Sequence, residues 1–298
     1  MSSSFTRLEG ARVLKPLASL VFSIAVIAPQ AAMIAPQAAM AGQGAAAAPA
    51  NFASKAGSGI AAEMLTLGMP YVVPAHVPGS KVRTPEGLAP LLAERLGREL
   101  PLQAVRVSGG VYRSVEGSGD GAHVDALLVP LDAGQIVDND KIIIPTGYRA
   151  GIMAIMRTDT DIRGWEDLRG RTVCLAEGSG LAGRMQQRWG AIEKVFRAPA
   201  DALLDLRIGG CDAAVHDSTM LKALLAFPEW KKFSAQLPVQ RERDLAFVLS
   251  KNDRKLADAM RSKVGEWRRH ELLAKLTEQS ARDIAFEVYM DQEVPDCH

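Results

Sequence analysis

The chain has few cysteines, few aromatic residues and almost no excess of charge. Three of its 298 residues are cysteine, aromatic residues make up 5%, and the formal net charge is +1. It has no basic stripe and no cluster of aromatic and basic side chains, so it lacks the usual signature of a nucleic-acid-binding protein. No cysteine occurs in the first 41 residues, which excludes lipid attachment at a processed cysteine there. We therefore expect no nucleic-acid partner and no lipid anchor.

The longest apolar run near the start is also short. Pro16 to Ala28 gives 13 residues, whereas a helix that spans a membrane needs about 20. Basic residues precede this run (Arg7, Arg12 and Lys15), and Ala39-Met40-Ala41 offers a small-residue cleavage site. Residues 1–41 are therefore predicted to be a cleaved secretory signal peptide. The heptapeptide IAPQAAM occurs twice in tandem and lengthens the apolar stretch, so an uncleaved anchor remains the alternative.

Beyond the leader, residues 42–58 are rich in Ala, Gly and Pro and are expected to form a flexible tail. The remaining residues, roughly 240, are enough for two lobes of ordinary domain size. The charge of that mature part is close to zero, with 32 basic against 33 acidic side chains once Arg7, Arg12, Lys15 and Glu9 are removed from the totals of 35 and 34.

The most informative stretch runs from Ile162 to Leu221. It predicts a strand (RTVCLA) that ends in the turn Gly178-Ser179-Gly180, then two helices, then a strand that ends at Asp217. In an open α/β sheet, ligands bind where strands end on their carboxyl side at such turns. Free N–H groups at a glycine turn that opens a helix can hold an anion.

This order of motifs resembles the second lobe of the family 3 extracellular solute-binding proteins, the periplasmic receptors of polar amino acid ABC transporters. The resemblance rests on Asp167 to Arg171, on Gly178-Ser179, on the G-x-x-D-A pattern at Gly209 to Ala213, and on Asp217. It covers about residues 145–298. It implies an α/β, two-lobed type II periplasmic binding fold, each lobe a mixed, mostly parallel sheet flanked by helices, with two hinge crossings.

The crossings are expected at two apolar strands, GIMAIM (151–156) and LAFVL (245–249). These positions place the first part of lobe 1 at 59–155, lobe 2 at 156–245, and a return to lobe 1 at 246–298. The last helices, about 255–269 and 272–282, would then cover lobe 1. Near the start of lobe 1, Thr84 is predicted to cap a helix that begins at Pro85.

Asp217 is the first candidate for a ligand-binding residue. In the resembling family an acidic residue at this place binds the α-amino group of the solute, and the alternative is that Asp217 only caps the following helix. Gly178, Ser179 and Gly180 would offer donors to an anionic group. Tyr71 and Tyr148, each after an apolar stretch, would stack on the solute or hydrogen-bond to it.

One expected residue is missing. Receptors of this family usually carry a lobe 1 arginine that binds the ligand carboxylate, but the corresponding region, DAGQIVDNDK (132–141), contains none and has Val137 near the expected place. Arg149 is the nearest substitute, since a guanidinium group suits a carboxylate. A standard α-amino acid ligand is therefore in question.

Two cysteines, Cys174 and Cys211, lie near the starts of two predicted strands of the same lobe. Adjacent strands could bring them within bonding distance, and an oxidising compartment would allow a disulfide; relatives in the resembling family carry cysteines at similar places. Two free buried thiols are the alternative. Cys297 and His298 have no evident partner, and two ligands are too few for a structural metal site. We expect no metal and no cofactor.

The sequence thus favours a monomeric periplasmic receptor that binds a small polar solute and delivers it to an inner-membrane ABC permease. Two alternatives remain. One is an accessory protein of a periplasmic quinoprotein dehydrogenase, and the other is a dehydratase-like enzyme on the same fold, for which Glu177 and His216 are the only acid-base candidates near the crevice. We expect no enzymatic activity.

Overall fold

The computed structural model describes residues 64–106, 124–134 and 139–292. The predicted signal peptide (1–41), the predicted tail (42–58), Val137, Cys297 and His298 lie outside these residues. Within the described ranges, no helix combines the length and the apolar character that a membrane span requires.

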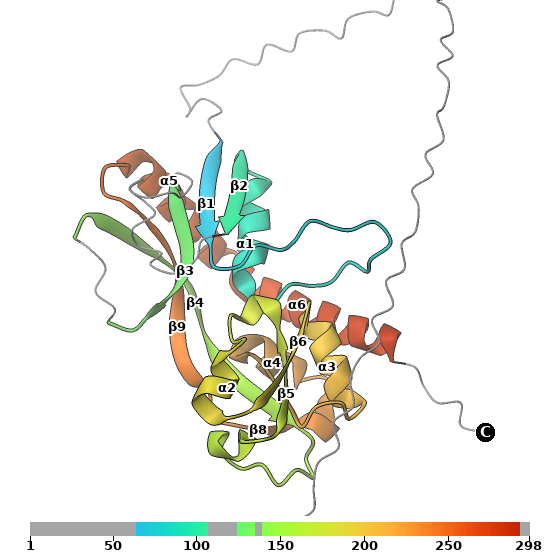
Figure 1. Ribbon diagram of the computed structural model, residues 1–298. Coiled ribbons are helices and arrows are strands. Elements are labelled where there is room, and N and C mark those ends of the chain that lie inside the picture. Colours follow the sequence, from blue (N-terminus) through green and yellow to red (C-terminus); the bar gives the residue numbers. More distant parts are fainter. Residues whose placement is uncertain (1–63, 107–123, 135–138, 293–298) are drawn as a thin grey trace, which may run out of the picture. The chain divides into compact units, whose positions relative to one another are not determined.

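Strands and helices are interspersed along the described part of the chain (Figure 1). The strands are β1 (Leu65–Met69), β2 (Leu102–Arg106), β3 (Ala126–Asp132), β4 (Lys141–Met156), β5 (Thr172–Ala176), β6 (Ile192–Phe196), β7 (Ala213–Asp217), β8 (Ala235–Gln236) and β9 (Gln240–Ser250). The α-helices are α1 (Leu88–Gly97), α2 (Arg184–Trp189), α3 (Pro199–Arg207), α4 (Ser218–Leu224), α5 (Arg254–Arg269) and α6 (Leu272–Asp291). Short 3₁₀ turns are η2 (Trp165–Leu168), η3 (Glu177–Ser179) and η4 (Pro228–Phe233).

The two longest strands, β4 and β9, join the two lobes. The strand order is β2-β1-β3-β9-β4-β7-β5-β6, and β8 pairs with β4. On one side, β9 pairs antiparallel with β3, and β1 pairs parallel with both β2 and β3. On the other side, β4 pairs antiparallel with β7, and β5 pairs parallel with β6 and β7. We refer to the β1–β3 side with α1 and α5 as lobe 1, and to the β5–β7 side with α2, α3 and α4 as lobe 2.

Each lobe has its own apolar core. In lobe 1, helix α1 places Leu88, Leu92 and Leu96 at four-residue spacing on one face, and all three are buried against the sheet. Helix α5 buries Trp267, Met260 and Val264 in the same cluster, so this helix covers lobe 1, as the sequence predicted. In lobe 2, separate clusters lie on the two faces of the β5–β7 sheet. The described residues therefore form an α/β fold in which two lobes are joined by the crossing strands β4 and β9, as predicted.

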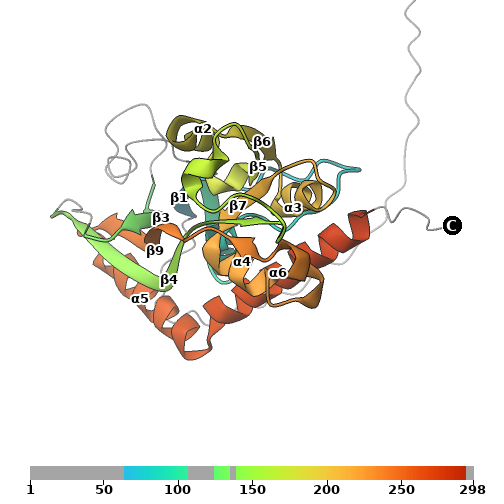
Figure 2. The same ribbon diagram turned by 90° about the horizontal axis from the view of Figure 1, so that it is seen from below.

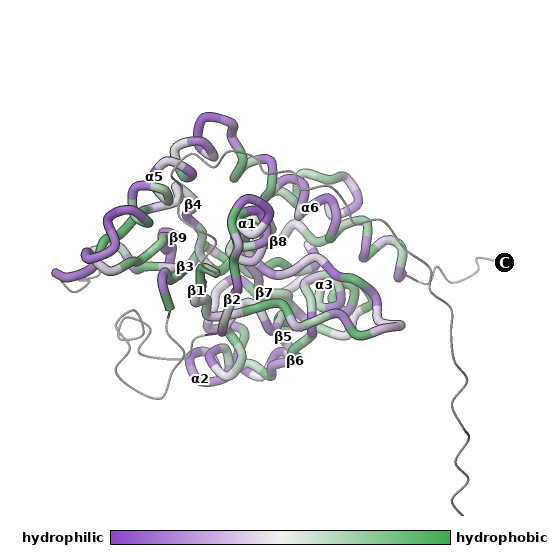
Figure 3. Tube along the Cα trace, turned by 90° about the horizontal axis from the view of Figure 1, so that it is seen from above, coloured by the Kyte–Doolittle hydropathy of each residue, from purple (hydrophilic) through white to green (hydrophobic). Residues whose placement is uncertain are grey.

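In Figure 3, hydrophobic residues (green) are frequent along the strands, and many hydrophilic residues (purple) lie on the helices. The predicted strands that end at the Gly178 turn and at Asp217 are present as β5 and β7, and the apolar run 245–249 lies in β9. Strand β6, between the two predicted helices, was not predicted. The domain boundaries at 155/156 and 245/246 remain predictions, since β4 and β9 run through both lobes.

The start of α1 differs from the prediction. The helix begins at Leu88 with Gly87 as its N-cap, and no side chain caps it. Thr84 is not the cap, because its backbone N–H and its hydroxyl both donate to Glu287 Oε1, at 2.9 and 2.7 Å. Thr84 therefore binds a carboxylate of α6 and does not cap α1.

Helix α6 also differs from the prediction. Its buried residues Ala281, Ile284 and Val288 belong to the core of lobe 2, whereas the sequence placed the last helices on lobe 1. A helix of 20 residues spans about 30 Å, which is long enough to continue from α5 towards α3 and α4 (Figure 2). Helix α6 therefore supports both lobes.

Gly151 on β4 lies where the two lobes meet and has no room for a side chain. A Cβ atom there would lie 2.4 Å from the carbonyl oxygen of Gln240 and 2.6 Å from a methyl carbon of Val239. Its N–H donates to Ser218 Oγ at 3.0 Å. The two crossing strands therefore depend on glycine at this position.

We expect Gly151→Ala to lower the free energy of unfolding by about 1–3 kcal/mol, the usual cost of overpacking. Chemical denaturation of the two proteins measures the difference. Gly97→Ala is the matched control, since a Cβ atom on Gly97 would find its nearest neighbour at 4.0 Å and alanine favours the helix. Equal stability of Gly151→Ala and wild type would contradict the close packing of β4 on β9.

Candidate ligand-binding cleft

A cleft of about 520 Å³ lies between the two lobes. Its lining comes from the loops after β1 and before α1, from the ends of β2, β3 and β7, from the η3 turn and the start of α2, and from the crossing strands β4 and β9. The polar and charged residues among them are Tyr71, Glu86, Arg106, Tyr148, Glu177, Ser179, Arg184, His216, Asp217 and Arg243. Of the predicted binding residues, all except Arg149 line this cleft.

The two lobes meet at Gly178. A Cβ atom on this glycine would lie 3.0 Å from Cβ of Glu86 and 3.0 Å from a ring carbon of Tyr71. Glu86 and Tyr71 come from the lobe 1 loops, whereas Gly178 follows β5 of lobe 2. The glycine turn is therefore a contact between lobes, and only the absence of a side chain lets the loops approach this closely.

Glu86 binds lobe 2 through both of its carboxylate oxygens. Oε2 lies 2.7 Å from His216 Nδ1, and Oε1 accepts the backbone N–H of Asp217 at 2.9 Å. Both side chains are buried, with His216 0% and Glu86 6% exposed. His216 Nε2 is buried and has no hydrogen-bond partner among the described residues. The pair fixes the loop before α1 to the end of β7.

Asp217 is the N-cap of α4. Its Oδ1 accepts the N–H groups of Thr219 (2.8 Å) and Met220 (3.2 Å), as expected for a capping aspartate. The same oxygen accepts the hydroxyl of Tyr148 at 2.8 Å and lies 2.6 Å from Thr219 Oγ1. The capping alternative for Asp217 is thus realised in this structure, whereas a role in solute binding remains a prediction.

Burial raises the pKa of the Asp217 carboxyl, and the nearby Glu86 raises it further, while hydrogen bonds from Thr219, Tyr148 and Met220 oppose the shift. Burial, followed by the charge of Asp217, likewise raises the pKa of Tyr148. Burial, followed by the charge of Glu177, raises the pKa of Tyr71. Deprotonation of Tyr148 and Asp217 is therefore disfavoured in this part of the cleft.

Replacing Asp217 by Asn should change how stability depends on pH. A carboxyl whose folded-state pKa is raised favours the protonated form, so its stabilising contribution is complete below the unfolded pKa of about 3.9 and is lost as the pH rises through the folded pKa. Asn keeps the cap and does not titrate, so Asp217→Asn should gain stability relative to wild type between mildly acidic and neutral pH.

Melting temperatures of both proteins from pH 4 to pH 8 measure this difference. Asp253→Asn is the matched control, because Asp253 caps α5 through a single bond to the N–H of Leu256 at an exposed position. A constant gap between Asp217→Asn and wild type across the range would show that the carboxyl is not destabilised by burial.

The glycine turn is built differently from the prediction. Residues Glu177–Ser179 form the 3₁₀ turn η3, Gly180 is left-handed with φ 65°, and α2 begins only at Arg184. The hydroxyl of Ser179 donates to the carbonyl of Ala176 at 2.6 Å and accepts the N–H of Leu181 at 3.2 Å. The turn therefore does not open a helix directly, and the Ser179 hydroxyl is engaged within the turn.

Arg149 does not lie in the cleft. Its guanidinium binds both carboxylate oxygens of Asp244 on β9, at 2.9 and 2.7 Å, and its side chain is 53% exposed. The substitution that the sequence suggested for the missing arginine is not supported by this geometry. Three other arginines line the cleft instead, Arg106, Arg184 and Arg243, and the sequence analysis did not single them out.

The place of Arg106 in the cleft could have been predicted from the sequence. It is the last residue of β2, a strand parallel to β1, and the carboxyl ends of parallel strands face the ligand crevice. Arg184 and Arg243 carry no comparable signal, because their approach depends on how α2 and β9 are placed.

The predicted disulfide between Cys174 and Cys211 is present, with the two Cα atoms 5.9 Å apart. It joins β5 to the residues just before β7. Strands β5 and β7 pair in parallel. Asp205 lies close to both sulfur atoms, but it binds Lys194 at 2.8 Å, and the sulfurs are bonded to each other. The disulfide therefore ties together the strands that present the η3 turn and Asp217.

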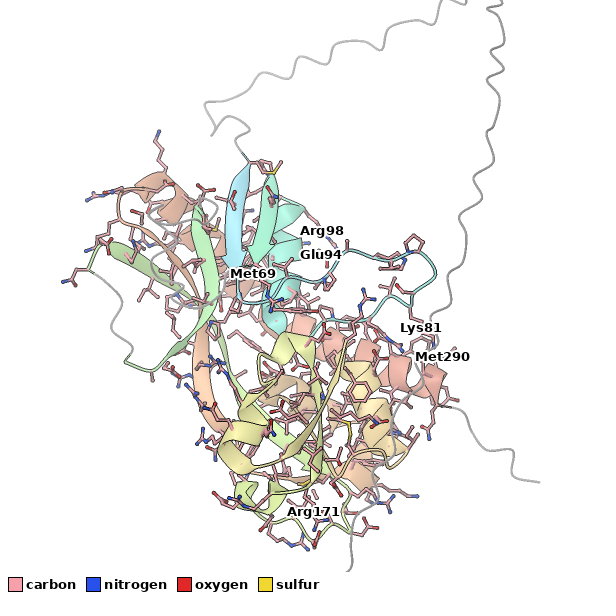
Figure 4. All side chains as sticks on the ribbon, in the orientation of Figure 1. Met69, Lys81, Glu94, Arg98, Arg171 and Met290 are labelled. Carbon is pink, nitrogen blue, oxygen red and sulfur yellow. A yellow bond between two sulfur atoms is a disulfide. The ribbon has the colours of Figure 1, made fainter. Side chains whose placement is uncertain are left out.

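A second link between lobes lies outside the cleft. Arg83, in the segment between β1 and α1, binds Asp201 of α3 at 2.7 Å and also pairs with Asp291 of α6. Lys81 binds Asp291 at 2.5 Å, and Figure 4 shows Lys81 next to Met290 at the end of α6. These ion pairs attach the segment between Tyr71 and Glu86, on one side of the cleft, to α3 and α6.

No protein-family model and no curated protein matches the chain. Among solved structures, a P235GK mutant of ArgBP from T. maritima is 21% identical with a TM-score of 0.44, over 72% of this chain and 94% of that one. The GluR0 ligand-binding core in complex with L-glutamate is 18% identical with a TM-score of 0.45, over 74% and 99%. The ancestral amino acid-binding protein AncCDT-1, a precursor of cyclohexadienyl dehydratase, is 18% identical with a TM-score of 0.46, over 72% and 94%. Likenesses at this level do not indicate what this chain binds.

Proposed function

We propose that the chain is a periplasmic solute-binding receptor that closes its two lobes on a small polar molecule and delivers it to an inner-membrane ABC permease. The observation that carries the proposal is the cleft of about 520 Å³ between two lobes connected by two strands. A cleft of this volume suits a small ligand, and two crossing strands can act as a hinge.

The lining supports a polar solute. Charged groups of both signs, two tyrosine hydroxyls and the backbone of a glycine turn converge on the cleft. In a closed, partly desolvated cleft, charge-assisted hydrogen bonds from such groups are strong and directional. The predicted signal peptide is the basis for the periplasmic location.

The enzymatic alternative gains little support from the acid-base candidates. His216 pairs with Glu86, and its remaining nitrogen, Nε2, is buried, so a solute in the cleft does not reach it in this arrangement. Glu177 is exposed, and among the described residues no hydrogen bond or ion pair joins it to His216. We therefore assign His216 and Glu86 a role in holding the lobes together.

Thermal-shift screening of the protein purified from the periplasm tests the proposal. The compounds should span amino acids, amines, sugars, carboxylic acids and inorganic anions. A ligand at 100 times its dissociation constant stabilises the folded state by about 2.7 kcal/mol, which gives a clear rise in melting temperature. Titration calorimetry then confirms a single site. A full panel without any stabilising compound would contradict a receptor role and favour a protein that binds a macromolecular partner.

A further inference from the structure

We propose that the solute is an anion with two or more negative charges, and that its binding requires no ammonium group. This inference rests on the proposed receptor function and specifies the class of its ligand. It follows from a comparison of the charged groups in the cleft. Some of them already bind other groups of the protein, and others have no such partner among the described residues.

Two carboxylates of the cleft, the buried Glu86 and the partly buried Asp217, already accept hydrogen bonds from the protein. Glu86 uses one oxygen for His216 and the other for the N–H of Asp217. Asp217 receives its hydrogen bonds from Tyr148, Thr219 and Met220 through Oδ1, and burial opposes its charge. Glu86 therefore has no oxygen left for an α-amino group, and Asp217 has only Oδ2 left, on a carboxyl whose charge is disfavoured by burial. Glu177 remains as an exposed carboxylate at the edge.

The guanidinium groups are in the opposite situation. Arg106 and Arg184 line the cleft with exposed side chains, and no ion pair or side-chain hydrogen bond of either is present within the described ranges. Other arginines near the two lobes are paired, such as Arg83 with Asp201 and Asp291, and Arg149 with Asp244. Two cationic forks thus face the cleft without a carboxylate partner among the residues that the structure describes.

The arginines come from different parts of the fold. Arg106 ends β2 in lobe 1, Arg184 begins α2 in lobe 2, and Arg243 lies on the crossing strand β9. A guanidinium group binds a carboxylate or phosphate group through two parallel hydrogen bonds. An anion with two acidic groups would therefore contact both lobes at once and favour the closed state.

Pairs of compounds that differ only in the ammonium group give a direct test. Succinate and L-aspartate form one such pair, and glutarate and L-glutamate form another; citrate and inorganic phosphate extend the range of anions, and putrescine and L-arginine represent cations. We expect at least one anion without an amine to bind in titration calorimetry, and no amino member of a pair to bind more tightly than its counterpart. We also expect affinity to fall as salt is raised.

Variants then locate the site. Arg106→Gln and Arg184→Gln should each weaken the best anion by roughly tenfold to a hundredfold, the effect of losing one hydrogen bond to a charged group. Arg149→Gln, an exposed arginine outside the cleft, is the matched control and should leave the affinity unchanged. Melting temperatures without ligand show whether each variant is folded.

Three results would overturn the inference: binding of the amino compounds or cations alone, no binding by any anion, or an anion affinity that neither cleft variant changes. The first leaves the receptor function intact, since a solute is still bound. Failure of the whole wider screen, by contrast, would count against the receptor function itself.

Discussion

Removing the disulfide between Cys174 and Cys211 should lower the free energy of unfolding by about 4 kcal/mol. The two cysteines are 37 residues apart, and closing a loop of this length restricts the unfolded chain by about that amount in the loop-entropy model. The closed loop includes η3, α2, β6 and α3. Loss of the disulfide would therefore affect most of lobe 2.

The experiment compares wild type with the double variant Cys174→Ala and Cys211→Ala by chemical denaturation. Alanine avoids leaving a free thiol or a hydroxyl in a buried position, since Cys174 is 0% and Cys211 7% exposed. Reduction of wild type with dithiothreitol is an independent route to the same state. If the double variant and the reduced protein both matched the oxidised wild type, the bond would contribute nothing to the fold.

Glu86→Ala is expected to have the second large effect, a loss of about 3 kcal/mol. The substitution leaves the Nδ1 nitrogen of His216 and the N–H of Asp217 without a partner at a buried position, and each unsatisfied group costs about 1–3 kcal/mol. Since Glu86 connects the loop before α1 to β7, we also expect the cleft to open more readily. Small-angle scattering of ligand-free protein should then show a larger radius of gyration.

Glu94→Ala is the matched control for Glu86. Glu94 lies on the exposed side of α1 and pairs with Arg98 one turn later, at 2.5 Å (Figure 4). An exposed pair of this kind contributes about 0.3–0.5 kcal/mol. If Glu86→Ala cost no more than Glu94→Ala, the contact between Glu86 and His216 would not hold the two lobes together.

The sequence predicted much of the order of elements, though not β6, because strands and turns are encoded locally. The apolar runs that became β1, β3 and β9 are bounded by glycine, proline or charged residues, and the leucines of α1 follow helical spacing. The pairing of Cys174 with Cys211 needed one further assumption. The two strands near whose starts these cysteines lie had to be neighbours in the sheet.

The charge pattern of the cleft was much less accessible to prediction. Glu86 looked like a residue in the first turn of a helix, yet it lies before α1 and reaches across to His216. Arg106, Arg184 and Arg243 are far apart in sequence and converge only because β2, α2 and β9 end or pass beside one cleft. Such convergence depends on sheet order and on lobe closure, and neither leaves a periodic signal in the sequence.

The two shared strands also bear on the order in which the chain can fold. Strand β3 obtains its β9 partner only when residues 240–250 are present, about 110 residues later in the chain. The β5–β7 sheet, by contrast, is complete by residue 217. During synthesis, lobe 2 can therefore acquire its sheet while lobe 1 still lacks an interior strand. Pairings so distant in sequence slow folding, and until β9 arrives the unpaired edge of β3 can pair with another chain and so promote aggregation.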